Sequence, residues 1–263
     1  MGEITYYRDE NLPFFEIKSC TLNLHPEKKH AHDEYSIALI EKGNSVLGYL
    51  NEYVEISQGQ VVLIEADIMH LCQPKDKENW VYQMLYIKKT WFKDLLKQGV
   101  LPHKLLVKSL KRKEVKMVQT AFNQLKSQIS TLEKEEILIE LIEYLFYIEN
   151  CFIFNEEVIT NNDIACEKIK EFINANFLEK IYLEQLSELC GLSRYYIIRL
   201  FKQKHDITPH AYQISCRMNY AKEEMSKGRE VTRIAHEIGF YDESHFSKTF
   251  KSYFGVTPQA YLK

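Results

Sequence analysis

Short alternating runs of apolar and polar residues fill roughly the first ninety positions. The runs read SIALIEKG, SVLGYL, YVEISQGQVVLIEA and WVYQMLYIKK, and they are rich in β-branched and aromatic residues. Turn-forming groups separate them, among them Lys42-Gly43-Asn44, Gln58-Gly59 and Pro74-Lys75-Asp76. Strands this short with turns this frequent are typical of a sandwich or a barrel.

After about Thr90 the apolar spacing changes to three and four residues, which predicts helices. The segment EKEEILIELIEYLFYIENCFIF has the widest apolar face, and this face can either cover the barrel or contact a second copy of the chain. Its members are Ile137, Leu138, Leu141, Ile142, Leu145, Phe146 and Ile148.

The polar stretch NEEVITNND at 155–163 has no clear period and is interpreted as a linker. The fold class expected is α+β in two domains. Residues 1–154 are expected to form a β-barrel with packed helices that include a dimer contact. Residues 164–263 form an all-α domain.

The helical part contains a repeat. DITPHAY at Asp206–Tyr212 returns as GVTPQAY at Gly255–Tyr261, 49 residues later. Upstream, Gly191 matches Gly239 at an offset of 48, so one residue is inserted just after the second glycine. The repeat predicts two helix-turn-helix motifs joined by a helix across roughly Pro209–Lys227.

Local signals support these helix boundaries. Gly191 suits the positive φ at which a helix ends. Ser193 and Asp242 suit the N-caps of the two second helices. Thr208-Pro209 and Thr257-Pro258 each combine an N-cap with a proline at the first helical position.

Composition adds a charge asymmetry. The net charge is −3, but residues 164–263 carry 15 Lys/Arg against 12 Asp/Glu, and residues 1–163 carry 19 against 25. A mildly basic C-terminal part on an acidic N-terminal part is compatible with a DNA-binding domain joined to another domain.

The six cysteines form no Cys-x-x-Cys pair, and no apolar run reaches membrane-spanning length. We expect a cytoplasmic protein with free thiols and no membrane association.

The segment from LEQLSELCGLSRYYIIRLFK through HFSKTFKSYFGVTPQAY resembles the DNA-binding domain of the AraC/XylS transcription regulators, over about Ile181–Tyr261. The resemblance implies that each second helix enters the major groove of promoter DNA. Arg199 is the leading base contact, and Lys248 stands where arginine is usual. The DNA-binding residues implied by position are Arg194, Tyr195, Ile198, Arg199, Lys202, Glu243, Ser244, Ser247, Lys248 and Lys251.

Three histidines mark the N-terminal part. His30 and His32 precede one predicted strand and His70 ends another, which resembles the cupin-like sensor domain common in the same family. The glutamate expected in metal cupins falls at Ser36 or Ile37, neither of which binds metal. An organic-ligand pocket, a zinc or iron site with Cys72 as a fourth ligand, and purely structural histidines all stay open.

We assign these residues to ligand binding and assign no metal, cofactor or catalytic residue. The ligand-binding residues are His30, His32, Tyr35, His70, Tyr82 and Tyr86. The function predicted is a sequence-specific transcription regulator, not an enzyme, whose activity depends on a small molecule in the N-terminal barrel. The alternative is a metal-dependent cupin enzyme fused to a DNA-binding domain. The partners expected are promoter DNA, an unidentified effector, RNA polymerase and a second copy of the chain.

Overall fold

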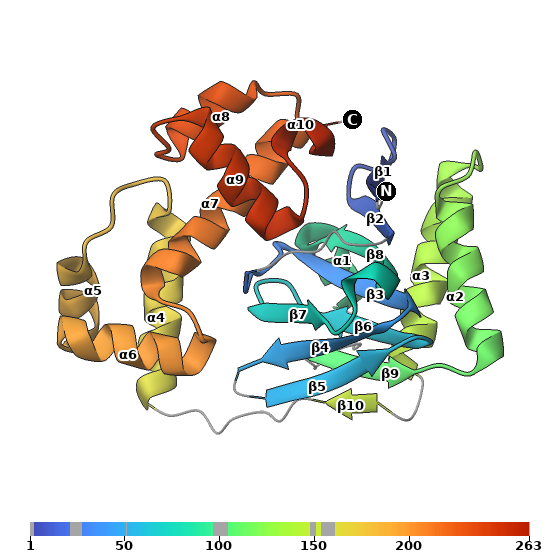
Figure 1. Ribbon diagram of the computed structural model, residues 1–263, viewed down its shortest axis with the longest axis horizontal. Coiled ribbons are helices and arrows are strands. Elements are labelled where there is room, and N and C mark those ends of the chain that lie inside the picture. The colour runs from blue at the N-terminus through green and yellow to red at the C-terminus, as the bar shows by residue number, and fades with distance from the viewer. Residues whose placement is uncertain are drawn as a thin grey trace.

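The computed structural model describes residues 3–21, 28–50, 52–96, 105–147, 151–153 and 161–262. A sheet-rich N-terminal part and a helical C-terminal part lie side by side (Figure 1). The expected α+β fold in two domains is confirmed.

Ten antiparallel strands are present among the described residues of the N-terminal part. A seven-stranded sheet has the order β1-β2-β8-β3-β6-β9-β10, and a three-stranded sheet has the order β5-β4-β7. The strands are β1 Glu3–Arg8, β2 Phe15–Thr21, β3 Glu34–Lys42, β4 Asn44–Tyr49, β5 Glu52–Ser57, β6 Gln60–Ile64, β7 His70–Pro74, β8 Val81–Lys88, β9 Leu105–Ser109 and β10 Cys151–Ile153. A short 3-10 helix, Lys77–Asn79, precedes β8.

Strand alternation divides the large sheet into two faces. Side chains such as Ile40, Val62 and Met84 face the small sheet and fill the barrel between the two sheets. Their neighbours, such as Leu39 and Leu85, face the other way and pack against helices. Both faces are apolar because each is covered, which explains why the strands read as nearly continuous hydrophobic runs.

Helices α2 and α3 cover the outer face of the large sheet, as Figure 1 shows. The helices of this part are α1 Lys89–Leu96, α2 Arg112–Leu125 and α3 Thr131–Tyr147. In α3, Leu138, Leu141 and Leu145 are buried against the sheet. The apolar face of this segment therefore covers the barrel, and its use in a dimer stays a prediction; Phe146 and Ile148 belong to the part whose side chains are not described.

Seven helices form the C-terminal part among the residues described after 160. They are α4 Asn161–Asn176, α5 Leu183–Cys190, α6 Arg194–His205, α7 Pro209–Ser226, α8 Val231–Glu237, α9 Glu243–Phe254 and α10 Pro258–Tyr261. Helices α5 and α6 form one helix-turn-helix, α8 and α9 form the second, and α7 joins them. This is the arrangement predicted from the repeat.

The predicted caps are present. The side chains of Ser193, Asp242 and Thr208 each accept a hydrogen bond from a backbone N–H in the first turn of α6, α9 and α7. Gly191 has φ +64° and ends α5 in the left-handed conformation. Gly239 has φ +85°, and a Cβ there would lie 3.1 Å from the Arg217 guanidinium, so the backbone approaches α7 closely.

The expected linker 155–163 lies mostly outside the described residues. Helix α4 begins at Asn161, and residues 154–160 are not described, so the domain boundary stays a prediction. Among the helices that the structure describes, none is long and apolar enough to cross a membrane.

Candidate DNA-binding and effector sites

The second helix of the first motif, α6, presents a polar outer face. Arg194, Tyr195, Arg199 and Lys202 are exposed, and Ile198 is half-buried. Tyr195 is 76% exposed although it is aromatic, and the Arg194 guanidinium pairs with Glu184 of α5. The inner face of the helix packs into the core, so the predicted contact residues share the free side.

The second helix of the second motif, α9, repeats this arrangement. Glu243, Ser244, Lys248 and Lys251 are exposed, and Ser247 is half-buried. Glu243 accepts a 2.9 Å hydrogen bond from the Thr232 hydroxyl of α8, which fixes one carboxylate oxygen. All ten predicted DNA-binding residues therefore lie on two helices in equivalent positions of the repeat.

An aromatic side chain at the turn of the second motif was not singled out from the sequence. Tyr241 precedes the N-cap of α9 and is 94% exposed. The phenylalanine beside it, Phe240, is buried in the core, so the turn is held in place while the tyrosine points outward. The only sign in the sequence that Tyr241 points outward is that it directly follows Phe240, an aromatic residue that fills the core.

Inside the barrel, five of the six predicted ligand-binding residues meet at one small cavity of about 30 Å³. They are His30, His32, His70, Tyr82 and Tyr86. Lys18 and Cys72 also line it. This volume holds roughly one or two water molecules, which is too little for an organic effector.

The sixth residue, Tyr35, lies on the other face of the sheet. In β3 it pairs with Ile87 rather than with Tyr86, so alternation turns its ring away from the cavity. The ring stacks on Phe92 at a centroid distance of 4.1 Å, and its hydroxyl lies 3.4 Å from Glu65.

The three histidines form what we call the histidine cluster, His30, His32 and His70. All three are buried, and their ligand atoms lie within 4.8 Å of one another. Burial lowers the pKa of each imidazole below its ordinary value, that of His70 to about 4. The cluster is therefore neutral at physiological pH and presents nitrogen lone pairs.

Cys72 and Lys18 complete the chemistry of the barrel cavity. Burial raises the pKa of the Cys72 thiol to about 12, so the sulfur is protonated. Burial lowers the pKa of Lys18 to about 8. The Lys18 ammonium donates a 3.1 Å hydrogen bond to the carbonyl oxygen of Phe254, the last residue of α9.

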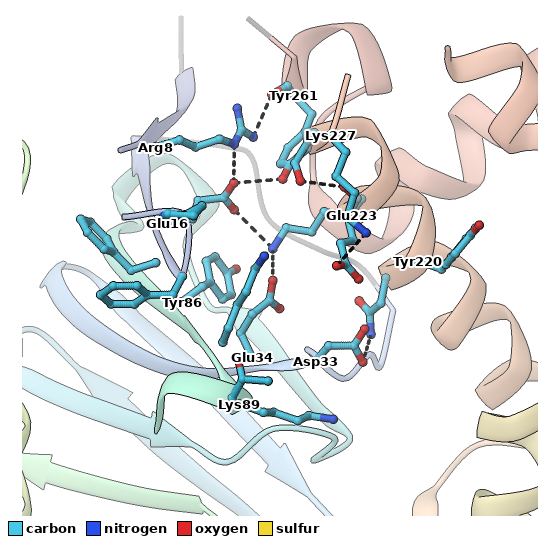
Figure 2. A pocket seen from close by; sticks show the side chains of 18 of the residues that line it. Arg8, Glu16, Asp33, Glu34, Tyr86, Lys89, Tyr220, Glu223, Lys227 and Tyr261 are labelled. Carbon is cyan, nitrogen blue, oxygen red and sulfur yellow. Dashed lines mark hydrogen bonds and ion pairs between the residues drawn. The ribbon is translucent and has the colours of Figure 1, made fainter. Parts of the chain in front are cut away.

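A much larger space, the interdomain cleft, opens between the barrel and helices α4 and α7. Its volume is about 1030 Å³. Figure 2 shows barrel residues such as Arg8, Glu16 and Tyr86 on one side of the cleft and Glu223 of α7 on the other. Cavities of roughly 300–1,000 Å³ are typical of small-molecule sites, so the cleft has room for an organic effector.

A buried ion-pair network lines the cleft. The Lys222 ammonium of α7 lies 3.0 Å from Glu34 and 3.3 Å from Glu16, both in the barrel. It also lies 4.3 Å from the centre of the Tyr86 ring, at cation–π distance. Burial alone would lower the pKa of Lys222, but the two carboxylates outweigh it and raise that pKa.

The same network holds the C-terminal end of the chain. Glu16 accepts from Arg8 at 2.7 Å and from the Tyr261 hydroxyl at 2.9 Å. Burial would raise the pKa of Glu16, but Lys222 and Arg8 hold it below its ordinary value. These dashed contacts in Figure 2 join β1, β2 and α10.

Sequence reasoning missed Glu16, Lys18 and Lys222. In FEIKSC the two charges alternate with apolar residues, which is normally the pattern of a strand with a solvent-facing side. The register shows the reverse, because Glu16 pairs with Tyr86 and Lys18 with Met84, on the cavity face. No sequence signal distinguishes Lys222 from the exposed lysines nearby.

Comparison with known proteins agrees with both halves of the molecule. The model of the AraC-like ligand binding domain matches residues 20–142, and that of a helix-turn-helix domain matches residues 186–263. The chain therefore combines an AraC-like ligand binding domain with a helix-turn-helix domain.

Relatives named as HTH-type transcriptional regulators or activators match most of the chain. The HTH-type transcriptional regulator YbfI of Bacillus subtilis is 29% identical over 220 residues, which cover 82% of this chain and 80% of the relative. The HTH-type transcriptional activator RhaS of Escherichia fergusonii is 25% identical, covering 95% and 94%.

The fold also matches a solved structure of the same architecture. The crystal structure of ToxT from Vibrio cholerae, described as bound to an unsaturated fatty acid, has a TM-score of 0.60 at 19% identity. The match covers 100% of this chain and 94% of that chain.

Proposed function

We propose that this regulator binds promoter DNA through α6 and α9 and that a small-molecule effector bound between the barrel and α7 controls this binding. The observation that carries the proposal is the pair of recognition helices, each with a buried inner face and a free outer face. Helix-turn-helix proteins place such a helix in the major groove.

On α6, Arg199 is placed to contact a guanine, because an exposed arginine can donate two parallel hydrogen bonds to O6 and N7. Tyr195 and Ile198 are placed to meet thymine methyl groups. Arg194 and Lys202 hold phosphates, which gives affinity without sequence information.

On α9, Glu243 is placed to accept from cytosine N4, and Lys248 approaches a purine with a single ammonium. Ser244 and Ser247 lie between them on the same helix, and Lys251 follows one turn later to hold phosphate. Because the two motifs differ in their exposed side chains, the proposed operator has two unlike half-sites.

The effector is proposed to occupy the interdomain cleft. An organic molecule there would contact the barrel and α7 at the same time, so its binding energy depends on how the two parts dock. Such a ligand shifts the equilibrium only when it binds two docking states unequally. The ToxT structure described with an unsaturated fatty acid shares this fold, and an elongated acid is therefore the first class to test here.

The wider assembly is part of the proposal. A cytoplasmic location follows from the DNA target. The further partners are a second copy of the chain and RNA polymerase. For contact with a second copy, α2 and α3 offer the exposed apolar side chains of Met117 and Leu132. An enzymatic role is not proposed, since the two relatives described above are transcription regulators.

The test is DNA binding of the full chain to fragments of its own upstream region, at two salt concentrations. Wild type is compared with Arg199→Ala and with Arg112→Ala, a charge-matched control whose side chain is exposed on α2. We expect roughly 5- to 150-fold weaker binding for Arg199→Ala, with relaxed preference at one base pair. Equal affinity for Arg199→Ala and Arg112→Ala would exclude the assigned contact.

A further inference from the structure

The histidine cluster has the geometry of a preformed ligand set. His30 and His32 come from the segment before β3, and His70 begins β7. The backbones of His30 and His70 exchange two hydrogen bonds of 3.1 and 3.0 Å, which fixes these two residues opposite each other. The three ring centroids are 4.7, 4.7 and 5.1 Å apart.

Hydrogen bonds fix which ring nitrogens are free. Nδ1 of His30 lies 2.8 Å from the carbonyl oxygen of Lys28, and Nδ1 of His70 lies 2.9 Å from that of Ile68. A carbonyl oxygen only accepts, so each Nδ1 carries the proton and each Nε2 keeps its lone pair. This is the arrangement in which protein histidines bind metal ions.

His32 supplies an independent sign that the cluster binds a ligand. Its side chain is buried, and its Nδ1 has no hydrogen-bond partner among the described residues. A buried polar nitrogen without a partner is unfavourable, typically by 1–3 kcal/mol. A bound ion or its coordinated water would remove that penalty.

We propose that His30, His32 and His70 bind a single divalent transition-metal ion of the zinc type, and that this ion controls how the DNA-binding domain docks on the barrel. The cavity volume of about 30 Å³ suits an ion with one coordinated water and excludes an organic effector. Neutral imidazoles favour Zn²⁺, Co²⁺ and Ni²⁺ over Mg²⁺ and Ca²⁺, which prefer oxygen ligands.

The distances allow binding with a small contraction. Zinc–nitrogen bonds of ~2.0 Å in a tetrahedron separate two donors by ~3.3 Å, whereas the ligand atoms here lie within 4.8 Å of one another. The ion would draw the imidazoles together by up to ~1.5 Å. Three protein ligands leave the fourth coordination position of the ion for water. Cys72 lines the same cavity but is not among the three residues whose ligand atoms lie together.

The segment that carries two of the ligands also carries the contacts to the DNA-binding domain. Between the histidines, the carbonyl oxygen of Ala31 accepts a 2.9 Å hydrogen bond from Asn219 of α7. On either side of them, Lys29 pairs with Asp206 at the end of α6, and Asp33 lies 3.4 Å from Asn219. Residues in extended chain alternate between two sides, so the histidines face the cavity while their neighbours face α6 and α7.

Contraction of the histidine cluster therefore moves the residues that hold α6 and α7. This part of the inference rests on the proposed function, since it assumes that the position of the recognition helices decides DNA affinity. Lys18 gives the cavity a second contact, because it donates to the end of α9. An ion in the cluster would thus lie next to Lys29, which contacts the end of α6, and in the same cavity as Lys18, which contacts the end of α9.

Metal binding is tested first, without DNA. The full chain, treated with a chelator and dialysed, is titrated with Zn²⁺ and Co²⁺. We expect one ion per chain, the visible absorption of tetrahedral Co²⁺, and loss of both in His32→Gln and His70→Gln. His236→Gln, an exposed histidine on α8, is the matched control. Circular dichroism and melting temperature establish that each variant is folded.

Binding weaker than ~10 µM in wild type, or equal binding in His32→Gln and His236→Gln, would overturn the metal site. A rise in the melting temperature of wild type with Zn²⁺, absent in folded His32→Gln, supports it by mass action.

Regulation is tested by DNA affinity with chelator and with Zn²⁺. We expect a tenfold or larger change in wild type and in His236→Gln, and none in His32→Gln. A stoichiometric ion with unchanged DNA affinity would overturn the regulatory part. Specific DNA binding in chelator establishes the proposed function independently, so failure of that function and failure of the metal inference give different results.

Discussion

The interdomain network makes one strong energetic prediction, which concerns Lys222. Lys222→Met keeps an unbranched, apolar side chain but removes the terminal ammonium group and its charge. It leaves Glu16 and Glu34 without their shared ammonium group in a buried site, since Lys222 is 5% exposed.

The magnitude follows from which contacts remain. Removing one partner of a buried ion pair typically destabilises a protein by 3–5 kcal/mol, because the other charge is left buried. Glu16 keeps its hydrogen bonds from Arg8 and Tyr261, and the Glu34 side chain is 22% exposed, so water reaches it. We therefore expect a loss of about 3 kcal/mol, at the lower end of this range.

Lys227→Met on the same helix is the control. Lys227 pairs with Glu223 and Glu224 at 3.0 and 2.7 Å, but its side chain is 52% exposed. Exposed ion pairs contribute about 0–1 kcal/mol. The two substitutions are chemically identical, so the difference between them isolates burial at the domain interface.

The assay is urea unfolding followed by two probes. Trp80 and Trp91 are the only tryptophans in the sequence, and both belong to the N-terminal part, so fluorescence follows the barrel. Circular dichroism follows the helices. Because Lys222 joins the two parts, Lys222→Met should lower the midpoint and separate the two transitions. If Lys222→Met and Lys227→Met give the same midpoints, the buried network does not hold the parts together, and the reasoning is refuted.

Three further predictions follow from local features. The pKa of Glu16 is held below its ordinary value of 4.5, so the contribution of its carboxylate to stability is present above about pH 4.5 and is lost as the pH falls through the folded-state pKa. The stability difference between wild type and Glu16→Gln, measured by urea unfolding at a series of pH values, should therefore shrink in acid. Gly43 has φ +85°, and a Cβ there would lie 2.4 Å from the Asn79 carbonyl oxygen, so Gly43→Ala should lower the free energy of unfolding by more than ~2 kcal/mol. Gly228 has φ +82° but lies in open space, so Gly228→Ala should lower it by about 1 kcal/mol. Equal losses would contradict the clash at Gly43. Phe122→Ala in α2 should lower the unfolding free energy by about 3–5 kcal/mol because Phe122 is fully buried. Leu132 is 64% exposed, so Leu132→Ala should leave the unfolding free energy nearly unchanged. A small loss for Phe122→Ala would mean that α2 does not cover the sheet as described.

The DNA-binding half is largely determined by local sequence. Ser193, Thr208 and Asp242 cap helices through hydrogen bonds that span three residues, so the pattern in the chain specifies the cap directly. Apolar spacing then identifies the buried side of α6 and α9, and the remaining side chains must face outward. The repeat made the same prediction twice, which is why all ten assigned residues lie on the two recognition helices.

The N-terminal half depends on pairings between distant residues. Tyr35 and Tyr86 look equally suited to a pocket in the sequence, but a shift of one residue in strand register turns a side chain to the opposite face. The register of β3 with β8 therefore decided that Tyr86 lines the cavity and Tyr35 does not. The same register brought the charges of Glu16 and Lys18 inside.

By itself the sequence determined the two-domain α+β organisation, the two helix-turn-helix motifs and the three histidines. Only the tertiary structure decided that the histidines meet within 4.8 Å, that Lys222 pairs with Glu34 and Glu16, which are 188 and 206 positions away in the chain, and that the cleft rather than the barrel has room for an organic effector. The physical reason is range: caps and helical faces form between neighbours in the chain, whereas cavities and buried ion pairs form between segments that meet only when the chain is folded.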